Sequence, residues 1–360
     1  MVRNQAAGQG WITVLALGLL ASLWLSLGFG STGVGLPDAS RVLWQAVSGG
    51  TESTGSGDEL REPEAGDPSS TAAARVILQI RLPRTLLAAL VGALLALSGV
   101  VMQAFFRNVM AEPYLVGVSS GAALGAVLAM LCGWSLHIGW FSTVPLTAFV
   151  FALGTVLLVY LIHLRRGGIQ AGSLLLSGIA IASAISAVVA LLLVTSERSI
   201  QEVIFWLLGS FAAARWEHVG IVIPYALIGL GVTLVLARDL DLLLWGDVTG
   251  AALGVRIGRT RTILLAAAAL MTAACVAVSG VLGFVGLMVP HIARSLVGAG
   301  HRRLIPAAML LGGLLLLWAD VLARTLRAPT ELPLGAITAI VGAPFLVYLC
   351  SSKGRQGWLS

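Results

Sequence analysis

The sequence predicts an all-α, polytopic membrane protein with ten transmembrane helices. Apolar residues occupy 58% of the 360 positions and charged residues 11%, whereas a soluble domain has roughly 45–50% and about 25%. Apolar windows of about 20 residues, the length that spans a bilayer as a helix, recur from Trp11 to Cys350. Because a helix pairs its own backbone groups, it is the expected spanning form. We treat residues 1–360 as one transmembrane domain.

Ten apolar windows are long enough to be membrane spans. The first resembles a secretory signal peptide, but its apolar run of about 20 residues is long for one. No A-x-A-like cleavage site follows it, so we expect an uncleaved anchor. The predicted spans are 11–30, 85–106, 114–132, 143–163, 173–195, 219–237, 262–281, 282–298, 304–323 and 333–351.

The placement of basic residues predicts that both chain ends are cytoplasmic. Short cytoplasmic loops carry an excess of Lys and Arg, and ten crossings from an inside N-terminus place most arginines inside. A smaller group falls on the outer side, where anchoring to lipid headgroups is one explanation. That group is Arg75, Arg81, Arg84, Arg324 and Arg327.

Two segments after the first span differ from the rest. Residues 49–74 are rich in Gly, Ser, Pro and acids, with almost nothing to bury, so we expect a flexible loop on the outer side of the membrane. Residues 37–47 before it predict a short capped amphipathic helix at the membrane interface, with Trp44 as its anchor.

A short internal repeat indicates two inversely oriented helix sets. Ser98-Gly99-Val100 recurs as Ser279-Gly280-Val281, each time in an Ala- and Leu-rich span. The predicted topology makes the first span run inward and the second outward. Opposed repeats of this kind are a transporter architecture with a passage at their interface.

Several other classes of function find no support in the sequence. The single lysine, Lys353, follows two serines rather than a glycine, so no phosphate-binding G-x-x-x-x-G-K-[ST] loop can be written. Cys132, Cys275 and Cys350 are widely spaced in apolar sequence, which predicts neither a disulfide framework nor a metal site. The arginines are scattered at segment ends, which disfavours nucleic-acid binding. We expect no catalytic residues, cofactor or metal, and an energy source on another subunit.

Ordered motifs cover most of the chain from residue 75 to 350. The N-terminal motifs are Arg81-Leu82-Pro83-Arg84, Ser98-Gly99-Val100-Val101-Met102-Gln103, Phe106-Arg107-Asn108-x-x-Ala111-Glu112-Pro113 and Leu115-x-Gly117-Val118-Ser119-x-Gly121-Ala122. The C-terminal motifs are Ala252-Leu253-Gly254-Val255, Ser279-Gly280-x-x-Gly283-Phe284, Pro290-His291-x-x-Arg294, Asp320-x-x-Ala323-Arg324 and Glu331-Leu332-Pro333-x-Gly335-x-x-Thr338. With these motifs the chain resembles FecCD-type permeases of bacterial ABC importers for iron chelates, haem and cobalamin.

The resemblance implies a homodimer of permeases in the bacterial inner membrane. It further implies two ABC ATPase subunits on the cytoplasmic side and a periplasmic substrate-binding protein on the other. Similar permeases place the fifth and tenth helices along the passage, and small residues on these helices fit that role, although ordinary close helix packing explains them too. The implied path residues are Ser177, Ala182, Ser183, Ser186, Gly335, Thr338 and Gly342.

Two inner elements also follow from the resemblance. The cytoplasmic gate falls on Asn108, Met110, Ala171 and Gly172, beside Gln170, although Met110 is equally explained as packing. Residues 238–261 form the expected ATPase-coupling loop, in which residues 246–256 predict two short helices broken at glycines. Its implied contact residues are Asp247, Ala252, Leu253, Gly254, Val255 and Arg256.

The outer arginines gain a function from the same resemblance. Arg81, Arg84 and Arg324 match positions that pair with acidic residues of the binding protein, a task that suits the planar guanidinium fork. Asp320 lies one helical turn from Arg324, so an ion pair explains it, whereas a proton relay is the functional alternative. A proton- or sodium-coupled secondary transporter is therefore the rival function, but it should need more carboxylates within the spans.

Overall fold

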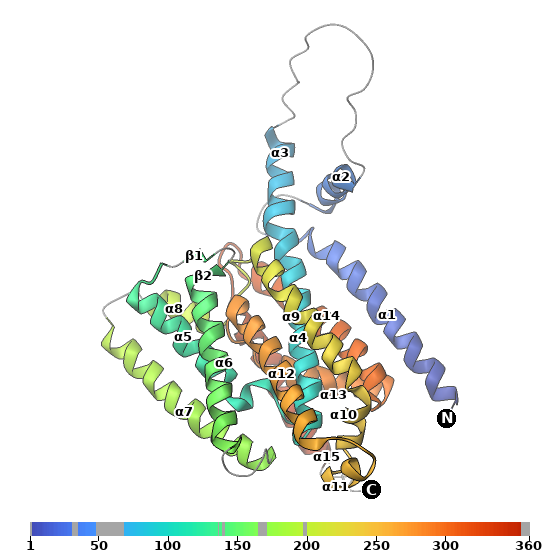
Figure 1. Cartoon of the computed structure of the whole chain (residues 1–360). Helices are drawn as coiled ribbons and strands as arrows, with labels where there is room; N and C mark the ends of the chain where they lie inside the picture. Colours follow the sequence, from blue (N-terminus) through green and yellow to red (C-terminus); the bar gives the residue numbers. More distant parts are fainter. Residues whose placement is uncertain are drawn as a thin grey trace, which may run out of the picture.

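The computed structural model describes residues 2–30, 35–47, 68–135, 137–138, 141–164, 171–196 and 200–353, and helices form most of these residues (Figure 1). An apolar helix occupies each of the ten predicted windows. These helices are α1 (Val2–Ser26), α4 (Leu82–Phe106), α5 (Val118–Cys132), α6 (Thr143–Leu164), α7 (Ala171–Thr195), α9 (Trp216–Val235), α12 (Ile257–Ser279), α13 (Val285–Val297), α14 (His301–Thr325) and α15 (Leu334–Lys353).

Seven helices in the described part of the chain are long and apolar enough to cross a membrane, and three further apolar helices, α5, α13 and α15, are shorter. The connecting elements are α2 (Leu36–Val47), α3 (Pro68–Arg75), the π-helix η1 (Val76–Arg81), the 3-10 helix η2 (Pro113–Val116), α8 (Ile200–Leu207), α10 (Ala237–Leu243) and α11 (Asp247–Ala252). Two-residue strands β1 (His137–Ile138) and β2 (Phe141–Ser142) pair antiparallel before α6.

The helix α4 is the centre of the main core, packed against α14, α12, α13 and α9. Small residues let the backbones meet. A Cβ atom on Gly99 would collide with the backbone of Gly286 in α13, and one on Gly92 with the carbonyl group of Gly312 in α14. Close approach of this kind is how helices associate where lipid gives no hydrophobic driving force between them. The sequence around Ser98-Gly99-Val100 therefore fixes the packing of α4 on α13.

The helices α5 and α6 pack closely on each other and, through α12, on the central helices. The helix α7 packs mainly along α5 and α6 and lies at one edge of the bundle (Figure 1). Most of its residues are exposed or half-buried in the single chain. An apolar helix this exposed faces either lipid or another protein surface.

Connecting elements gather at the two opposite ends of the bundle. The elements α2, α3 and the β-hairpin lie at one end, which we call the outer end, whereas α10 and α11 lie at the other, the inner end (Figure 1). The helix α1 begins, and α15 ends, toward the inner end. The two ends of the bundle therefore carry different connecting elements.

The structure corrects two local expectations and confirms a third. Of the predicted loop 49–74, the last part, from Pro68, belongs to α3, because proline suits the first turn of a helix and the alanines that follow are strong helix formers; residues 49–67 lie outside the described residues. Residues 246–256 contain one short helix, α11, rather than two, and the second short helix, α10, precedes it. The predicted amphipathic helix is present as α2, with Trp44 74% exposed.

Candidate functional site

Three of the five outer arginines are buried in the protein. Arg81, Arg84 and Arg324 are 4%, 7% and 6% exposed. The Arg84 guanidinium holds Oδ1 of Asp320 at 2.8 Å and Oε1 of Glu331 at 2.6 Å. Arg84 thereby ties α4 both to α14 and to the segment that leads into α15. The sequence motifs do not predict this double pairing, because both partners lie more than 200 residues from Arg84 in the chain.

The other two arginines bind the end of α1. Nη1 of Arg81 donates to the carbonyl oxygen of Leu27 at 2.5 Å, and Nη2 of Arg324 donates to that of Ser26 at 2.9 Å. The predicted i, i+4 pair of Arg324 with Asp320 is present, with 3.6 Å between Nε and Oδ2. These bonds satisfy the carbonyl groups left open where a helix ends.

The burial of these side chains differs from the expectation that they stand free at the surface. Their positive charge is held just inside the outer end, and their contact with a partner remains a prediction. The Glu331 side chain is 34% exposed and is the most accessible member of the cluster formed by Arg81, Arg84, Asp320, Arg324 and Glu331. We call this set the outer charge cluster.

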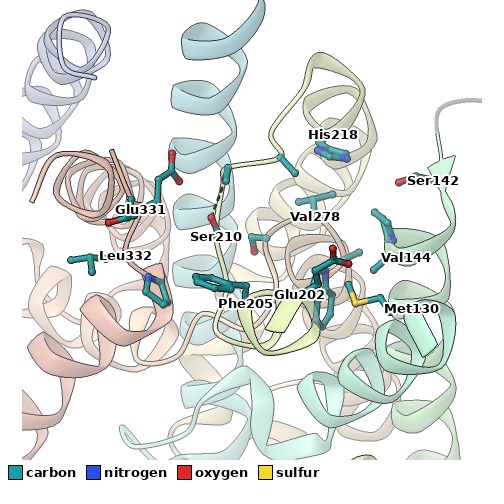
Figure 2. Close-up of a pocket in the computed structure, with 18 residues that line it drawn as sticks. Met130, Ser142, Val144, Glu202, Phe205, Ser210, His218, Val278, Glu331 and Leu332 are labelled. Carbon is teal, nitrogen blue, oxygen red and sulfur yellow. Dashed lines mark hydrogen bonds between the residues drawn. The ribbon is translucent and has the colours of Figure 1, made fainter. Parts of the chain in front are cut away.

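A pocket of about 620 Å³ opens beside the outer charge cluster (Figure 2). Its walls come from α8, the start of α9, the end of α12, the first turn of α6 and residues 330–333. Figure 2 shows Glu331 and Leu332 on one side and Ser142 and Val144 on the other. The lining is largely apolar with a few polar groups, an arrangement typical of sites that take up organic molecules. The pocket residues Glu202 and His218 were missed in the sequence, because neither lies in a motif.

The predicted path residues on α7 divide into two groups. Ser183 and Ser186 are exposed and Ala182 is half-buried, so they lie toward the open side of α7. Ser177 instead faces α6, since its hydroxyl lies 3.3 Å from Nε2 of His163 and donates to the carbonyl oxygen of Ser173 at 2.9 Å. The side of α7 that carries Ala182, Ser183 and Ser186 is thus available to line a passage or to contact a second copy of the chain.

The predicted path residues on α15 contact the same chain. A Cβ on Gly335 would collide with the backbone of Leu208, and one on Gly342 with the ring of Phe284. Thr338 is 4% exposed and its hydroxyl donates to the carbonyl oxygen of Gly335 at 3.1 Å. The packing explanation therefore accounts for these three in the single chain. The exposed face of α15 carries larger apolar residues, namely Ile340, Val341, Val347 and Tyr348.

The predicted inner gate begins at a strained turn. Arg107, which ends α4, has a left-handed backbone with φ of 50°. Asn108 next to it is exposed, and its Oδ1 accepts a hydrogen bond from the backbone N–H of Met110 at 2.9 Å. Met110 is half-buried. The side chain of Asn108 thus holds the backbone of this turn in place.

The other half of the predicted gate lies at the start of α7. Ala171 is half-buried and Gly172 has open space where a side chain would lie. Gln170 lies outside the described residues. The small size of both residues leaves the entrance of α7 free of bulky groups.

The predicted coupling loop presents apolar side chains at the inner end. Trp245, Val248 and Leu253 are 75%, 87% and 54% exposed. Gly246 and Gly254, which flank α11, have φ of +100° and +92°, a conformation that favours glycine. Of the other predicted contact residues, Ala252 and Arg256 are exposed and Val255 is 7% exposed. Three large apolar groups on one short segment are typical of a protein contact.

Asp247 fixes α11 to the transmembrane helices. Its Oδ1 accepts from Nη2 of Arg261 in α12 at 2.9 Å and lies 3.6 Å from Nη2 of Arg107. This connection was not expected from the sequence, which gave Asp247 only as a contact residue of the ATPase.

The FecCD transport family model matches residues 18–352. The chain belongs to the FecCD transport family. It is 46% identical over 77% of its length to the cobalamin import system permease protein BtuC of Halobacterium salinarum, of which 74% is covered. It is also 38% identical to the hemin transport system permease protein HmuU of Yersinia pestis, with 95% of this chain and 97% of that one covered.

The fold agrees with a solved relative. A chain from the structure described as an inward-facing conformation of a putative metal-chelate type ABC transporter superposes with a TM-score of 0.78. The two share 34% sequence identity, over 95% of this chain and 98% of that one. The predicted resemblance is confirmed, and FecCD-family chains are permease subunits of ABC importers rather than catalytic subunits.

Proposed function

We propose that this chain is the permease subunit of a binding-protein-dependent ABC importer in the bacterial cytoplasmic membrane. It crosses the membrane ten times with both ends cytoplasmic, and it carries an iron chelate, haem or cobalamin inward by alternating access. The observation that carries the proposal is the exposed α11 segment with Trp245, Val248 and Leu253 at the inner end of the family fold. Such a surface needs a soluble partner there, and an ABC ATPase is the partner that the family implies.

The exposed helices support a homodimer with the passage between the copies. The open side of α7 carries Ser183 and Ser186, and the exposed face of α15 carries Ile340 and Val341. A symmetric dimer that buries these faces would place two copies of each helix around one axis. Small hydroxyl residues on α7 would then line the passage, while the larger residues of α15 seal it against lipid. Membrane lipid covers the remaining exposed apolar surface of the dimer.

The outer end supports docking of a periplasmic substrate-binding protein. Three arginines and two carboxylates form the outer charge cluster, which leaves an excess positive charge of one there. An acidic partner would be steered toward such an end at low ionic strength. We retain Arg81, Arg84 and Arg324, which are buried, as the source of the positive charge beneath this docking surface, with Glu331 as the exposed member of the cluster.

The pocket beside the cluster supports a bulky organic cargo. Its volume of about 620 Å³ falls in the range of sites that bind drug-sized molecules. The relatives named above are described as cobalamin, hemin and metal-chelate transporters. The shared chemistry is a metal held in an organic ligand.

The rival function is a proton- or sodium-coupled secondary transporter. Asp320 is the intramembrane carboxylate that such a mechanism would use, but it is 2% exposed and bonded to Arg84. Its oxygen atoms are engaged by Arg84 and Arg324, so a structural ion pair accounts for Asp320, and a single carboxylate makes no relay chain. We therefore favour the ATP-driven importer.

Partner capture tests the proposed function. The tagged permease, expressed with the ABC ATPase of its import system, should retain two ATPase subunits per permease dimer during purification. A triple variant with Trp245→Ser, Val248→Ser and Leu253→Ser should lose the ATPase and keep the permease dimer. Retention of the ATPase by this variant would contradict the docking role of the α11 segment.

A further inference from the structure

We propose that Asp247 is a positioning residue that transmits movement of α11 to the inner gate turn at residues 107–110. The proposal rests on the proposed function, because α11 moves only if an ATPase grips it. The new element is the ion pair through which movement of α11 would reach the transmembrane helix α4.

The carboxylate of Asp247 lies where three elements meet. It is the first residue of α11, and it bonds to Arg261 in α12 at 2.9 Å and to Arg107 at the end of α4 at 3.6 Å. A Cβ on the adjacent Gly246 would lie 3.4 Å from Nη1 of Arg107. Backbone and side chain together therefore hold the start of α11 against the end of α4.

Arg261 provides the fixed side of this junction. Its side chain is 5% exposed, and its guanidinium carbon lies 5.7 Å from the ring centre of Phe105 in α4. Phe105 is itself 1% exposed and belongs to the core around α4 and α12. A guanidinium group held this way by an aromatic ring and a carboxylate has little freedom to follow α11 alone.

Arg107 provides the mobile side. Its side chain is 41% exposed, and its left-handed backbone joins α4 directly to Asn108. Because Asn108 caps the backbone of Met110, a displacement of Arg107 carries the residues of the predicted gate with it. A pull on α11 through Asp247 thus acts on the gate turn rather than on the core.

The charges explain why the bond matters for coupling more than for stability. Asp247 and Arg107 are each 41% exposed, and exposed ion pairs contribute little to the folding free energy. Without the carboxylate, however, the two guanidinium groups that share Asp247 are left as like charges that repel each other. The gate turn would then separate from α11 while the fold persists.

Distance measurements on the permease alone test the mechanical link. Spin labels at Val248→Cys and Val109→Cys, with Cys132→Ser and Cys350→Ser and with Cys275 left buried, report the separation of α11 and the gate turn in lipid nanodiscs. We expect one narrow distance distribution, which Asp247→Asn and Arg107→Gln each broaden. Asp241→Asn is the matched control, since Asp241 is an inner acid of the same exposure that pairs with His301 instead.

Transport by the reconstituted importer tests the functional consequence. Asp247→Asn should keep ATP hydrolysis but lower uptake per ATP by at least about fivefold, the lower end of measured couplings between sites. Asp247→Glu should restore it in part, and Asp241→Asn should leave it unchanged. A narrow distribution in Asp247→Asn, or uptake per ATP equal to that of the parent, would overturn the link. If the parent permease captures no ATPase, the proposed function fails, while the nanodisc distances still decide the link.

Discussion

Nη2 of Arg84 lies 2.8 Å from Oδ1 of Asp320, although 236 residues separate them in the chain. The two side chains are 8% and 3% exposed, so the pair is held away from water. Glu331 accepts hydrogen bonds from Nη1 and Nη2 of the same guanidinium group, on the edge next to the one that Asp320 occupies. The pair with Asp320 therefore holds α4 against α14 near the outer end. The bond to Glu331 holds the segment from which α15 begins.

Arg84→Ala should lower the stability of the permease strongly. Removing one member of a buried ion pair leaves an uncompensated charge, which costs about 3–5 kcal/mol. Thermal unfolding in detergent should show a clearly lower midpoint, whereas Arg327→Ala, which removes an exposed arginine of the same end, should change it little. Equal midpoints for Arg84→Ala and Arg327→Ala would contradict the buried pair.

Gly99→Ala should disturb the packing of α4 on α13. The added Cβ would meet the backbone of Gly286, and overpacking of a tight core typically costs about 1–3 kcal/mol. The matched control is Gly154→Ala in α6, where no atom lies within 4 Å of the added Cβ. Unfolding midpoints should fall for the first variant and stay level or rise for the second. A neutral Gly99→Ala would show that α4 and α13 are less close than described.

Gly254→Val should uncouple ATP hydrolysis from uptake. Space around this position is open, but its φ of +92° strains any residue with a Cβ, and the left-handed region costs roughly 1–2 kcal/mol. The strain should tilt the segment after α11 and change how it fits the ATPase. Gly258→Val is the control, because Gly258 is equally open and lies in the first turn of α12. The ratio of uptake to hydrolysis in proteoliposomes should fall for Gly254→Val alone. Equal ratios would speak against a role of the segment in coupling.

The pair of Asp241 with His301 should make stability depend on pH. Burial of the Asp241 carboxylate raises its pKa, but hydrogen bonds from the ring and backbone of His301 outweigh this and hold the pKa below its ordinary value. A depressed carboxyl pKa stabilises the fold above the unfolded-chain pKa of about 3.9, and this contribution is lost as pH falls through the folded-state pKa.

The measurement is the unfolding midpoint of the parent and of Asp241→Asn between about pH 7 and pH 3. The parent should be the more stable at neutral pH, and the difference should shrink only at the acid end. A difference that does not change with pH would mean that the Asp241 carboxylate does not take part through its charge.

The sequence predicted the ten apolar helices because their signal is local. The length and the hydropathy of a run such as residues 143–163 can be read from that run alone. The observed helix α6 accordingly begins at Thr143 and ends at Leu164. Helix ends were less predictable. Pro68 and the alanines after it were assigned to a loop on composition, although α3 continues into η1 and α4.

The partners of side chains were not predictable, because they depend on packing between distant helices. Arg84 was recognised as an outer arginine, but its bonds to Asp320 and Glu331 arise only when α4 and α14 lie together. The same limit applied to Gly335, whose small size fits a passage and a contact with Leu208 equally well. Asp247 was found through its motif, whereas its bonds to Arg107 and Arg261 needed the folded chain.

Uptake into proteoliposomes shows whether this permease moves its cargo only when a separate ATPase supplies the energy. The purified permease is reconstituted alone, and again with its ATPase and binding protein, and radiolabelled cobalamin, ferric citrate and haemin are offered with ATP inside. We expect that one cargo accumulates against its gradient only in the complete assembly, and only with ATP. Accumulation by the permease alone, driven by an imposed proton or sodium gradient, would contradict it.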